Sequence, residues 1–328
     1  MKRGIIFMLV SVFLALTLLP TMAGAQQPIP IRFGHVGFPG SLFAIIADEY
    51  AKRANASLKG RVDIKVFHSS QLGSDEQMSR GVKVGAPEMF LPSTVMSTIE
   101  QKFGVFEMPY IIVSRAHIKK VADNKQAQQN LFEPLPAKGM RILGVWENGF
   151  RHITNNVRPI AKPDDLKGIK LRVPGGVWRV KMFKAYGANP SPMPLAEVYS
   201  ALQSGVMDGQ ENPFPQIASA KFQEVQKFLS LSGHVYTPAY LVVGEDSWKK
   251  LPQDVQATLS KIAWEMGDFA RSEGARLDKE LMGKLAPPMK ANEVDKDGFI
   301  KASASIYEDF GKEVAGAAEL VRLIQSLR

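Results

Sequence analysis

The sequence predicts an α/β protein made of two units, and three observations carry this prediction. Short segments in which apolar and polar residues alternate, such as Ile29–Phe33, are followed by helical segments, and this order repeats. No flexible, low-complexity linker separates the first half of the chain from the second. Apolar residues between positions 255 and 281 recur at helical spacing, which predicts a long amphipathic helix that could pack on both units.

The first unit is predicted to contain a parallel sheet, because strands and helices alternate in it. Pro39-Gly40-Ser41 forms a turn and cap before the first helix. Ser74 with Gln77 three residues later is the capping-box pattern of a second helix. The expected elements are strands at 29–37, 62–69 and 87–93, with a helix at 42–57 and another beginning near 75.

The second unit is predicted from a further run of strands and helices. The apolar segment 228–245 is split at Thr237-Pro238, which suggests a strand that crosses between the units. The expected elements are strands at 141–150, 169–173 and 206–213, helices at 177–186 and 195–203, the long helix, and one final helix at 306–327.

The N-terminus is typical of a secretory signal peptide. Lys2-Arg3 precedes an uncharged segment from Gly4 to Pro20, and Ala23-Gly24-Ala25 fits the small-residue cleavage rule. An uncleaved membrane anchor is the alternative, although the apolar segment is short for a span. We therefore expect residues 1–25 to be removed near Ala25 and the mature protein to be exported to the periplasm.

Composition excludes several function classes. The 328 residues include no cysteine, which excludes disulfides, zinc–thiolate sites and thiol catalysis. The formal charge of +9 comes from basic residues scattered among acids, so nucleic acid is not the expected partner. The common hydrolase, nucleotide-binding and metalloprotease motifs are absent, and the five histidines are isolated. We expect no catalytic residue, no metal and no cofactor.

The segment "IKLRVPGG" at 169–176 contains the most informative arginine. Arg172 is the last polar residue of a predicted strand, and Gly175 follows in a loop where the backbone can approach a ligand closely. Arg172 is either a solvated edge charge or an anion receptor. Arg151 and Asn212 also lie where strands open into loops, and arginine matches a carboxylate with two parallel hydrogen bonds. If these loops converge, the cleft between them binds an anion.

The chain resembles the DctP-type solute-binding proteins of TRAP transporters over nearly its whole mature length. The resemblance rests on "NGFRHITNNVRPI" (148–160), "DLKGIKLRVP" (165–174), "GANPSPMPLAEVYSALQSGVMDGQENP" (187–213), "KFQEVQKFLSLSGHVYTPAYLVV" (221–243), "SSQLGSDEQM" (69–78) and "FEMPYII" (106–112). It implies a two-lobe, periplasmic-binding-protein-like (type II) fold with hinge strands and a long C-terminal helix that spans both lobes. On that basis the first lobe is expected at 26–148 plus 238–280, and the second at 149–237 plus 281–328.

The resemblance also implies the core of a ligand site. The arginine of the "LRVP" strand, here Arg172, forms a salt bridge to the carboxylate of the solute. The arginine after "NG", here Arg151, assists it, and the asparagine of "GQEN", here Asn212, contacts the same carboxylate.

The rest of the expected pocket is less closely defined. Related proteins often have a ring-bearing residue where this chain has Leu195, so Trp146 and Trp178 could supply an aromatic wall instead. Packing in the core is the alternative for each aromatic residue, and a helix-start acid is the alternative for Asp75. Further pocket candidates are Phe38, Asp75, Gly175, Phe214 and Tyr236. Arg80 and Arg179 could add charge, although a surface position is expected for both.

The predicted function is capture of a small organic acid outside the cytoplasm and its delivery to the small and large TRAP membrane subunits. A monomer is expected. The favoured ligand is a monocarboxylate with an apolar or aromatic body, such as a 2-oxo or 2-hydroxy acid; a C4-dicarboxylate or a sugar acid is the alternative. An exported enzyme and a sensor-input binding protein are the other functional classes that remain open.

Overall fold

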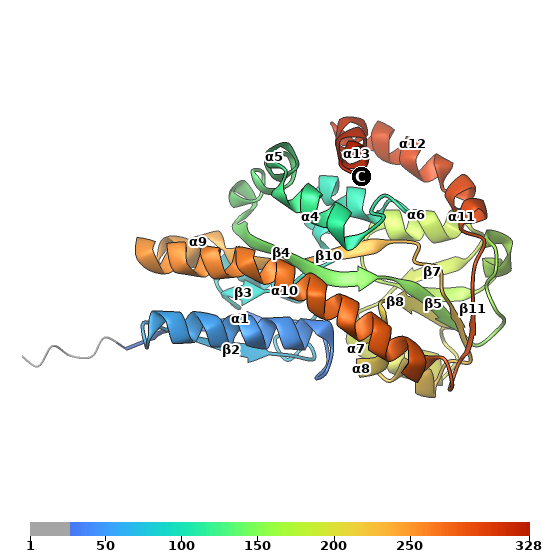
Figure 1. The fold of residues 1–328 in the computed structure, drawn as a ribbon, viewed down its shortest axis with the longest axis horizontal. Coiled ribbons are helices and arrows are strands. Elements are labelled where there is room, and N and C mark those ends of the chain that lie inside the picture. The colour runs from blue at the N-terminus through green and yellow to red at the C-terminus, as the bar shows by residue number, and fades with distance from the viewer. Residues whose placement is uncertain (1–26) are drawn as a thin grey trace, which may run out of the picture.

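The computed structural model describes residues 27–328, so the predicted signal peptide at 1–25 lies outside the described residues. No helix within 27–328 is both long enough and apolar enough to cross a bilayer. The structure has two mixed sheets, each covered by helices (Figure 1), which confirms the two-lobe α/β prediction. We call the units built on these sheets the first lobe and the second lobe.

The sheet of the first lobe has five strands, and the predicted alternation explains how β1 packs. Ile31 and Phe33 are buried, whereas Pro30 and Arg32, which alternate with them, are exposed. β1 pairs in parallel with β2 and β3, and β10 joins β3 in antiparallel orientation. In spatial order the strands are β2 (Val62–Phe67), β1 (Ile29–Gly34), β3 (Met89–Phe90), β10 (Tyr236–Gly244) and β4 (Met140–Phe150).

The sheet of the second lobe has six strands. β6 pairs in parallel with β7 and β8, and β5 pairs antiparallel with β8 and β9. The order is β11 (Lys290–Asn292), β9 (Phe228–Ser230), β5 (His152–Asn155), β8 (Gly209–Asn212), β6 (Lys170–Val173) and β7 (Asn189–Pro192).

Helices cover both sheets, and the two predicted caps are present. The Ser41 side chain accepts from the Ala44 N–H at the start of α1, and Ser74 and Gln77 form the expected capping box of α2. Before the chain returns to the first sheet, the helices are α1 (Leu42–Leu58), α2 (Asp75–Gly81), α3 (Met96–Ile99), α4 (Arg115–Asp123), α5 (Lys125–Phe132), α6 (Val177–Ala185), α7 (Leu195–Gln203) and α8 (Phe214–Ser219). Afterwards come α9 (Glu245–Lys249), α10 (Gln253–Leu285), α11 (Lys296–Ala302), α12 (Ala304–Glu313) and α13 (Ala317–Ser326). Short 3₁₀ helices lie at 82–84, 101–107, 136–138, 163–166 and 222–224.

Two adjacent strands connect the lobes. β4 continues through Arg151 into β5 of the second sheet, while the chain returns from β9 into β10. β4 and β10 pair antiparallel along their length, so the two crossings lie side by side. The crossing strands therefore place Arg151 at the boundary between the lobes.

The long helix α10 confirms the prediction from its apolar spacing, and it extends somewhat further than expected, over 33 residues. Leu259 and Met266 belong to the buried core of the first lobe, while Leu285 belongs to a core of the second. Figure 1 shows α10 lying diagonally across both sheets. Burial of side chains at both of its ends makes α10 a third connection between the lobes.

The end of the chain differs from the single helix predicted at 306–327. Gly316 adopts φ +75°, a left-handed conformation that interrupts the helix, so α12 and α13 are separate. Phe310 of α12 and Leu320 of α13 share the buried core of the first lobe, although residues 281–328 were expected in the second. The lobe boundaries stay a prediction, and we propose to count α12 and α13 with the first lobe.

Candidate functional site

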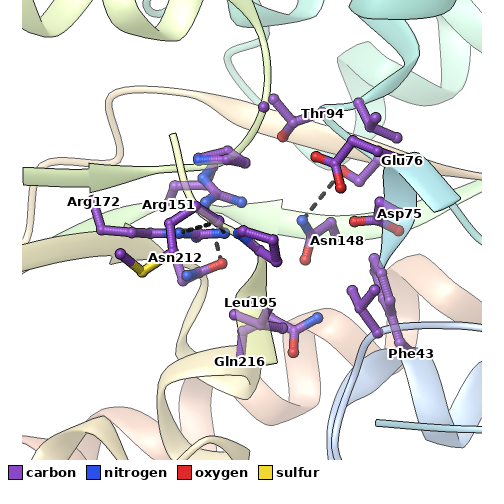
Figure 2. A pocket seen from close by; sticks show the side chains of 17 residues that line it. Phe43, Asp75, Glu76, Thr94, Asn148, Arg151, Arg172, Leu195, Asn212 and Gln216 are labelled. Carbon is purple, nitrogen blue, oxygen red and sulfur yellow. Dashed lines mark hydrogen bonds between the residues drawn. The ribbon is translucent and has the colours of Figure 1, made fainter. Parts of the chain in front are cut away.

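A cavity lies between the lobes where the loops after several strands meet (Figure 2), the usual place for a ligand in an α/β protein. It contains about 520 Å³ of empty space, open solvent included. The first lobe contributes Val36, Phe43, Asp75, Glu76, Ser93, Thr94, Val95 and Asn148. The second lobe contributes Arg151, Arg172, Pro174, Gly175, Met193, Pro194, Leu195, Asn212 and Gln216.

Arg172 is a buried cation without an anionic partner. Its side chain is 3% exposed, and its guanidinium donates from Nε and Nη2 to the Met193 carbonyl oxygen at 2.8 and 2.5 Å. Among residues 27–328 it forms no ion pair with a carboxylate. Burial, helped by the neighbouring charge of Arg151, lowers the pKa of Arg172 to about 10. A buried guanidinium of this kind favours a bound anion, since an uncompensated charge is costly to bury.

Arg151 differs from Arg172 because it is already paired. Its Nε lies 2.5 Å from Glu211 Oε2, and Nη2 donates to Glu211 Oε1 at 3.0 Å and to Asn212 Oδ1 at 3.1 Å. Asn212 Nδ2 in turn donates to Gln210 Oε1 at 2.6 Å. Arg151 and Asn212 therefore form a fixed floor beside Arg172, and Arg172 is left with the uncompensated charge.

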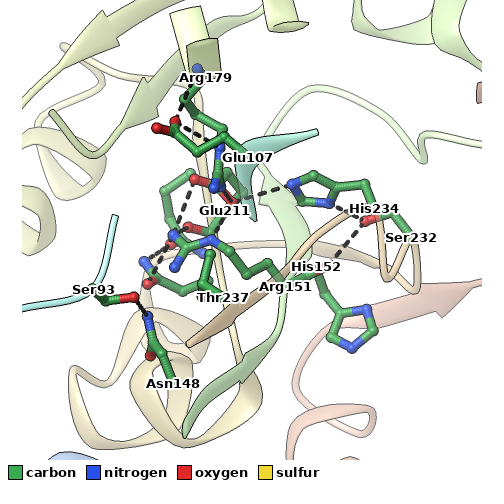
Figure 3. A network of polar contacts seen from close by, with 12 residues as sticks. Ser93, Glu107, Asn148, Arg151, His152, Arg179, Glu211, Ser232, His234 and Thr237 are labelled. Atoms are coloured by element: carbon green, nitrogen blue, oxygen red, sulfur yellow. Dashed lines mark hydrogen bonds and ion pairs between the residues drawn. The ribbon is translucent and has the colours of Figure 1, made fainter. Parts of the chain in front are cut away.

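Glu211 is the centre of a buried ionic network beneath the cavity (Figure 3). Besides Arg151, it accepts from Arg179 Nη1 at 2.7 Å and lies 3.2 Å from His234 Nε2. Burial would raise the pKa of Glu211, but the charges of Arg151 and Arg179 outweigh it and hold that pKa well below its ordinary value. Arg179 is fully buried, so the expectation of a surface position was wrong. The network joins elements far apart in sequence, and no local pattern indicated it.

The cavity is also lined by oxygen atoms that accept hydrogen bonds, on the first-lobe wall opposite Arg172 and, for Gln216, on the second lobe. Asp75 Oδ1, Asn148 Oδ1 and Gln216 Oε1 are buried and have no hydrogen-bond partner. Figure 2 shows Asp75 and Glu76 across the cavity from Arg172. Burial and the Glu76 charge raise the pKa of Asp75 to about 7, partly offset by Arg172. Buried acceptors normally have a donor, so this wall is suited to a ligand that carries hydroxyl groups.

Six of the predicted site residues meet in this cavity, namely Arg172, Arg151, Asn212, Asp75, Gly175 and Leu195. Gly175 also marks where the lobes touch, because a Cβ placed on it would lie 2.8 Å from Glu76 Oε1. The roles of these residues in binding remain a prediction.

The two tryptophans expected to form an aromatic wall do not line the cavity. Trp146 lies in the core of the first lobe against Tyr50, at 5.5 Å between ring centroids, and donates to the Ala263 carbonyl at 2.8 Å. Trp178 packs edge-on against Phe310 at 4.9 Å. For both residues the core-packing alternative is the one that the structure shows.

The other predicted aromatic residues also lie outside the cavity lining. Phe214 stacks on His152 at 4.3 Å, and Tyr236 donates to Glu147 Oε2 at 2.9 Å. Phe38 packs on a hydrophobic core of the second lobe. Phe43 is the one aromatic residue among the lining residues that the structure describes.

Sequence reasoning missed several lining residues that carry polar groups. Glu76 follows Asp75 directly, and Asn148 precedes Gly149 in the "NGFR" motif already used for Arg151. Gln216 lies in the first turn of α8, just after "GQENP". Each lies within four residues of a residue that was predicted, so the motifs located the loops correctly but not all of their inward-facing members.

The chain is similar to known proteins over most of its length. Residues 33–313 match the model of the bacterial extracellular solute-binding proteins, family 7 (DctP). The 2,3-diketo-L-gulonate-binding periplasmic protein of Escherichia coli is 32% identical over 91% of this chain and 92% of that protein. The C4-dicarboxylate-binding periplasmic protein DctP of Rhodobacter capsulatus is 35% identical over 84% of this chain and 82% of that protein.

Solved structures show the same architecture. A sugar acid binding protein of Advenella mimigardefordensis in complex with galactonate superposes with a TM-score of 0.87 at 32% identity, covering 92% of this chain and 99% of that one. A TRAP periplasmic solute-binding protein of Haemophilus influenzae with bound L-gulonate superposes with a TM-score of 0.87 at 28% identity, covering 92% and 100%.

Proposed function

Given that the chain belongs to the DctP family of TRAP-transporter solute-binding proteins, we propose that it captures a polyhydroxylated monocarboxylic acid, a sugar acid, and delivers it to the membrane subunits of a transporter. This family consists of solute-binding proteins that serve transport, and it is not a family of enzymes. The proposal goes beyond the family in two respects, the class of ligand and the residues that bind it.

The main observation behind this proposal is that the cavity contains one cation without a carboxylate partner and several acceptor oxygens without donors. Arg172 offers its charge to a carboxylate, and charge-assisted pairs of this kind are strong in buried sites. Asp75, Asn148 and Gln216 offer acceptor oxygens without donors. A sugar acid has one carboxylate and several hydroxyl donors along one chain, so it complements both walls.

This composition disfavours the ligand that the sequence suggested. An apolar or aromatic body would cover the acceptor oxygens of Asn148 and Gln216 without supplying donors, at a cost of about 1–3 kcal/mol for each. The expected aromatic partners are also absent, because Trp146 and Trp178 pack in cores. The sugar-acid alternative fits the cavity better, and the galactonate and L-gulonate complexes of similar proteins support it.

The same wall disfavours a C4-dicarboxylate. A second carboxylate in the cavity would approach Asp75 and Glu76, and like charges at short range oppose binding. No second unpaired cation stands on that side among the lining residues that the structure describes.

Thermal unfolding of residues 26–328 with a panel of acids tests the proposal. The panel contains D-galactonate, L-gulonate and D-glucuronate as sugar acids, succinate as a dicarboxylate, and phenylpyruvate as an aromatic 2-oxo acid, at pH 8. A ligand at a hundred times its Kd stabilises by about 2.7 kcal/mol, enough to raise Tm by several degrees. A shift confined to sugar acids supports the proposal. A shift with only succinate or phenylpyruvate, or with no acid after unfolding and refolding to remove co-purified ligand, contradicts it.

Replacing Asp75 with asparagine is expected to change ligand preference and not merely affinity. The variant loses a charged acceptor for hydroxyl groups, so galactonate binding should weaken by about tenfold to a hundredfold. Succinate binding should improve or stay equal, since repulsion is removed. Calorimetry measures both affinities. It is done at pH 8 because burial raises the pKa of Asp75 to about 7, and the side chain must be ionised for the comparison.

Asp297→Asn is the matched control for this change. Asp297 is an exposed acid in the first turn of α11 and is not among the residues that line the cavity. Equal losses for galactonate and succinate in Asp75→Asn would contradict a role for Asp75 in selecting the ligand.

A further inference from the structure

The first turn of α6 connects the ligand site to the opposite lobe. α6 begins directly after the loop that follows Arg172, and Pro174 and Gly175 of that loop line the cavity. Met182 and Phe183 further along α6 lie in a core of the second lobe. Trp178 in the first turn instead belongs to the core of the first lobe. One short helix therefore contributes to the cores of both lobes.

Trp178 fits against a surface that has room only because residue 104 is a glycine. Gly104 lies in the 3₁₀ helix at 101–107 of the first lobe. A Cβ placed on Gly104 would lie 2.5 Å from Trp178 Cδ1 and 2.9 Å from Phe310 Cε2, closer than Cβ atoms are normally found. The indole is 2% exposed. The contact is shape-complementary, and a single methyl group would disturb it.

Glu107, three residues after Gly104, contacts the same turn through polar atoms. Its Oε2 accepts from the Arg179 backbone N–H at 3.1 Å and lies 3.9 Å from Arg179 Nε. Gly176, the N-cap of α6, has no side chain to cap the helix, so a carboxylate from the other lobe satisfies a free N–H of the first turn and faces the positive end of the helix dipole. Arg179 also reaches Glu211, whose carboxylate holds Arg151.

The polar part of this contact is incompletely satisfied. Glu107 Oε1 and Arg179 Nε and Nη2 are buried without hydrogen-bond partners. Burial raises the pKa of Glu107 to about 7, which the charge of Arg179 partly offsets. A contact that leaves buried polar groups unpaired is less stable than a fully paired one, so separating the lobes costs less free energy.

We propose that Gly104 and Glu107 of the first lobe and Trp178 and Arg179 of the second form an interlobe latch that holds the Arg172 loop over the bound ligand. The four act as positioning residues, because none of them lines the cavity. The latch forms when the lobes close and must separate before the ligand leaves. It therefore sets the dissociation rate of the ligand, and this rests on the proposed function only in requiring a ligand between the lobes.

Stopped-flow binding of D-galactonate to Trp178→Leu tests the latch. Dissociation should accelerate about tenfold to a hundredfold while association changes by less than about threefold, because the latch contributes only after closure. Gly104→Ala should act in the same direction. In the double variant the smaller leucine makes room for the new methyl group, so the two effects should be less than additive. Gly283→Ala is the control, since a Cβ on Gly283 meets nothing within 4 Å.

Glu107→Gln and Glu107→Ala test the polar half in the same assay. The glutamine retains an oxygen that accepts from the Arg179 N–H, so its dissociation rate should lie between that of the wild type and that of the alanine variant. Unchanged dissociation in both Trp178→Leu and Glu107→Ala overturns the latch. Equal changes in association and dissociation also overturn it, since they indicate a general structural effect.

Measuring the distance between the lobes distinguishes a failure of the latch proposal from a failure of the proposed function. The chain has no cysteine, so Ser57→Cys on α1 and Gln203→Cys on α7 can be spin-labelled without background. D-Galactonate should shorten the distance in the wild type and shorten it less in Trp178→Leu. A wild type that no acid of the panel closes contradicts the proposed function alone. The ligand-free distances then decide: fewer closed molecules in Trp178→Leu support the latch, and equal populations overturn it.

Discussion

Replacing Arg172 with alanine is expected to weaken binding of the organic acid by at least about a hundredfold. The guanidinium is buried and forms no ion pair with a carboxylate among the described residues, so it is the charge available to the ligand. Removing one partner of a buried pair costs about 3–5 kcal/mol, and each 1.4 kcal/mol is a factor of ten in affinity. Isothermal titration with the acid that stabilises the wild type measures the loss.

The stability of the ligand-free variant provides the internal control. An unpaired buried charge opposes folding, so Arg172→Ala should unfold at the same urea concentration as the wild type or at a higher one. Arg172→Lys keeps the charge without the planar fork and should bind with intermediate affinity. Retained binding in Arg172→Ala would end the carboxylate-receptor interpretation, and a large loss of stability would show that Arg172 serves the fold instead.

Replacing Glu211 with glutamine is expected to have the opposite signature, a loss of stability. The change leaves Arg151 and Arg179 buried without their shared carboxylate. The expected loss is about 3–5 kcal/mol in the free energy of unfolding, measured with urea at pH 7. Glu280→Gln, which alters an exposed pair on α10, is the control and should change stability little.

The pH dependence of this loss has a defined direction. The pKa of Glu211 in the folded protein lies below its ordinary value of 4.5, although burial alone would raise it, because Arg151 and Arg179 stabilise the charged form. The stabilisation is therefore present above pH 4.5 and is lost as the pH falls further. The difference in the free energy of unfolding between the wild type and Glu211→Gln should therefore become smaller below that pH. A constant difference would show that the Glu211 charge is not its source.

Local patterns predicted the elements well because they depend on neighbouring residues. The alternation in β1, the Ser74 capping box and the spacing in α10 each need only a few positions in sequence. The break between α12 and α13 was missed because apolar spacing continues across it, whereas the extended backbone of Val314 ends α12 and the left-handed Gly316 precedes α13.

Sequence motifs correctly placed the loops that line the cavity. The predictions failed where residues close in sequence to those loops were assumed to be close to the cavity in space. Trp146 is five residues before Arg151, but at about 3.3 Å per residue a strand separates the two by some 16 Å. Trp178 is six residues after Arg172, and the first turn of α6 directs it to the other lobe. The ion pairs of Glu211 with Arg151 and Arg179 join residues 60 and 32 positions apart, which no short window can connect.

The hydrogen bonds that orient Arg172 have a consequence for how this cavity can change. They end on the main-chain oxygen of Met193, which every amino acid possesses. The Met193 side chain nevertheless lines the cavity. Position 193 can therefore change in size and polarity, and so reshape the rest of the cavity, while the guanidinium keeps its orientation. The orientation of Arg172 and the shape of the surrounding cavity thus depend on different atoms of residue 193. A side-chain substitution at this position can change ligand preference without rebuilding the arginine site.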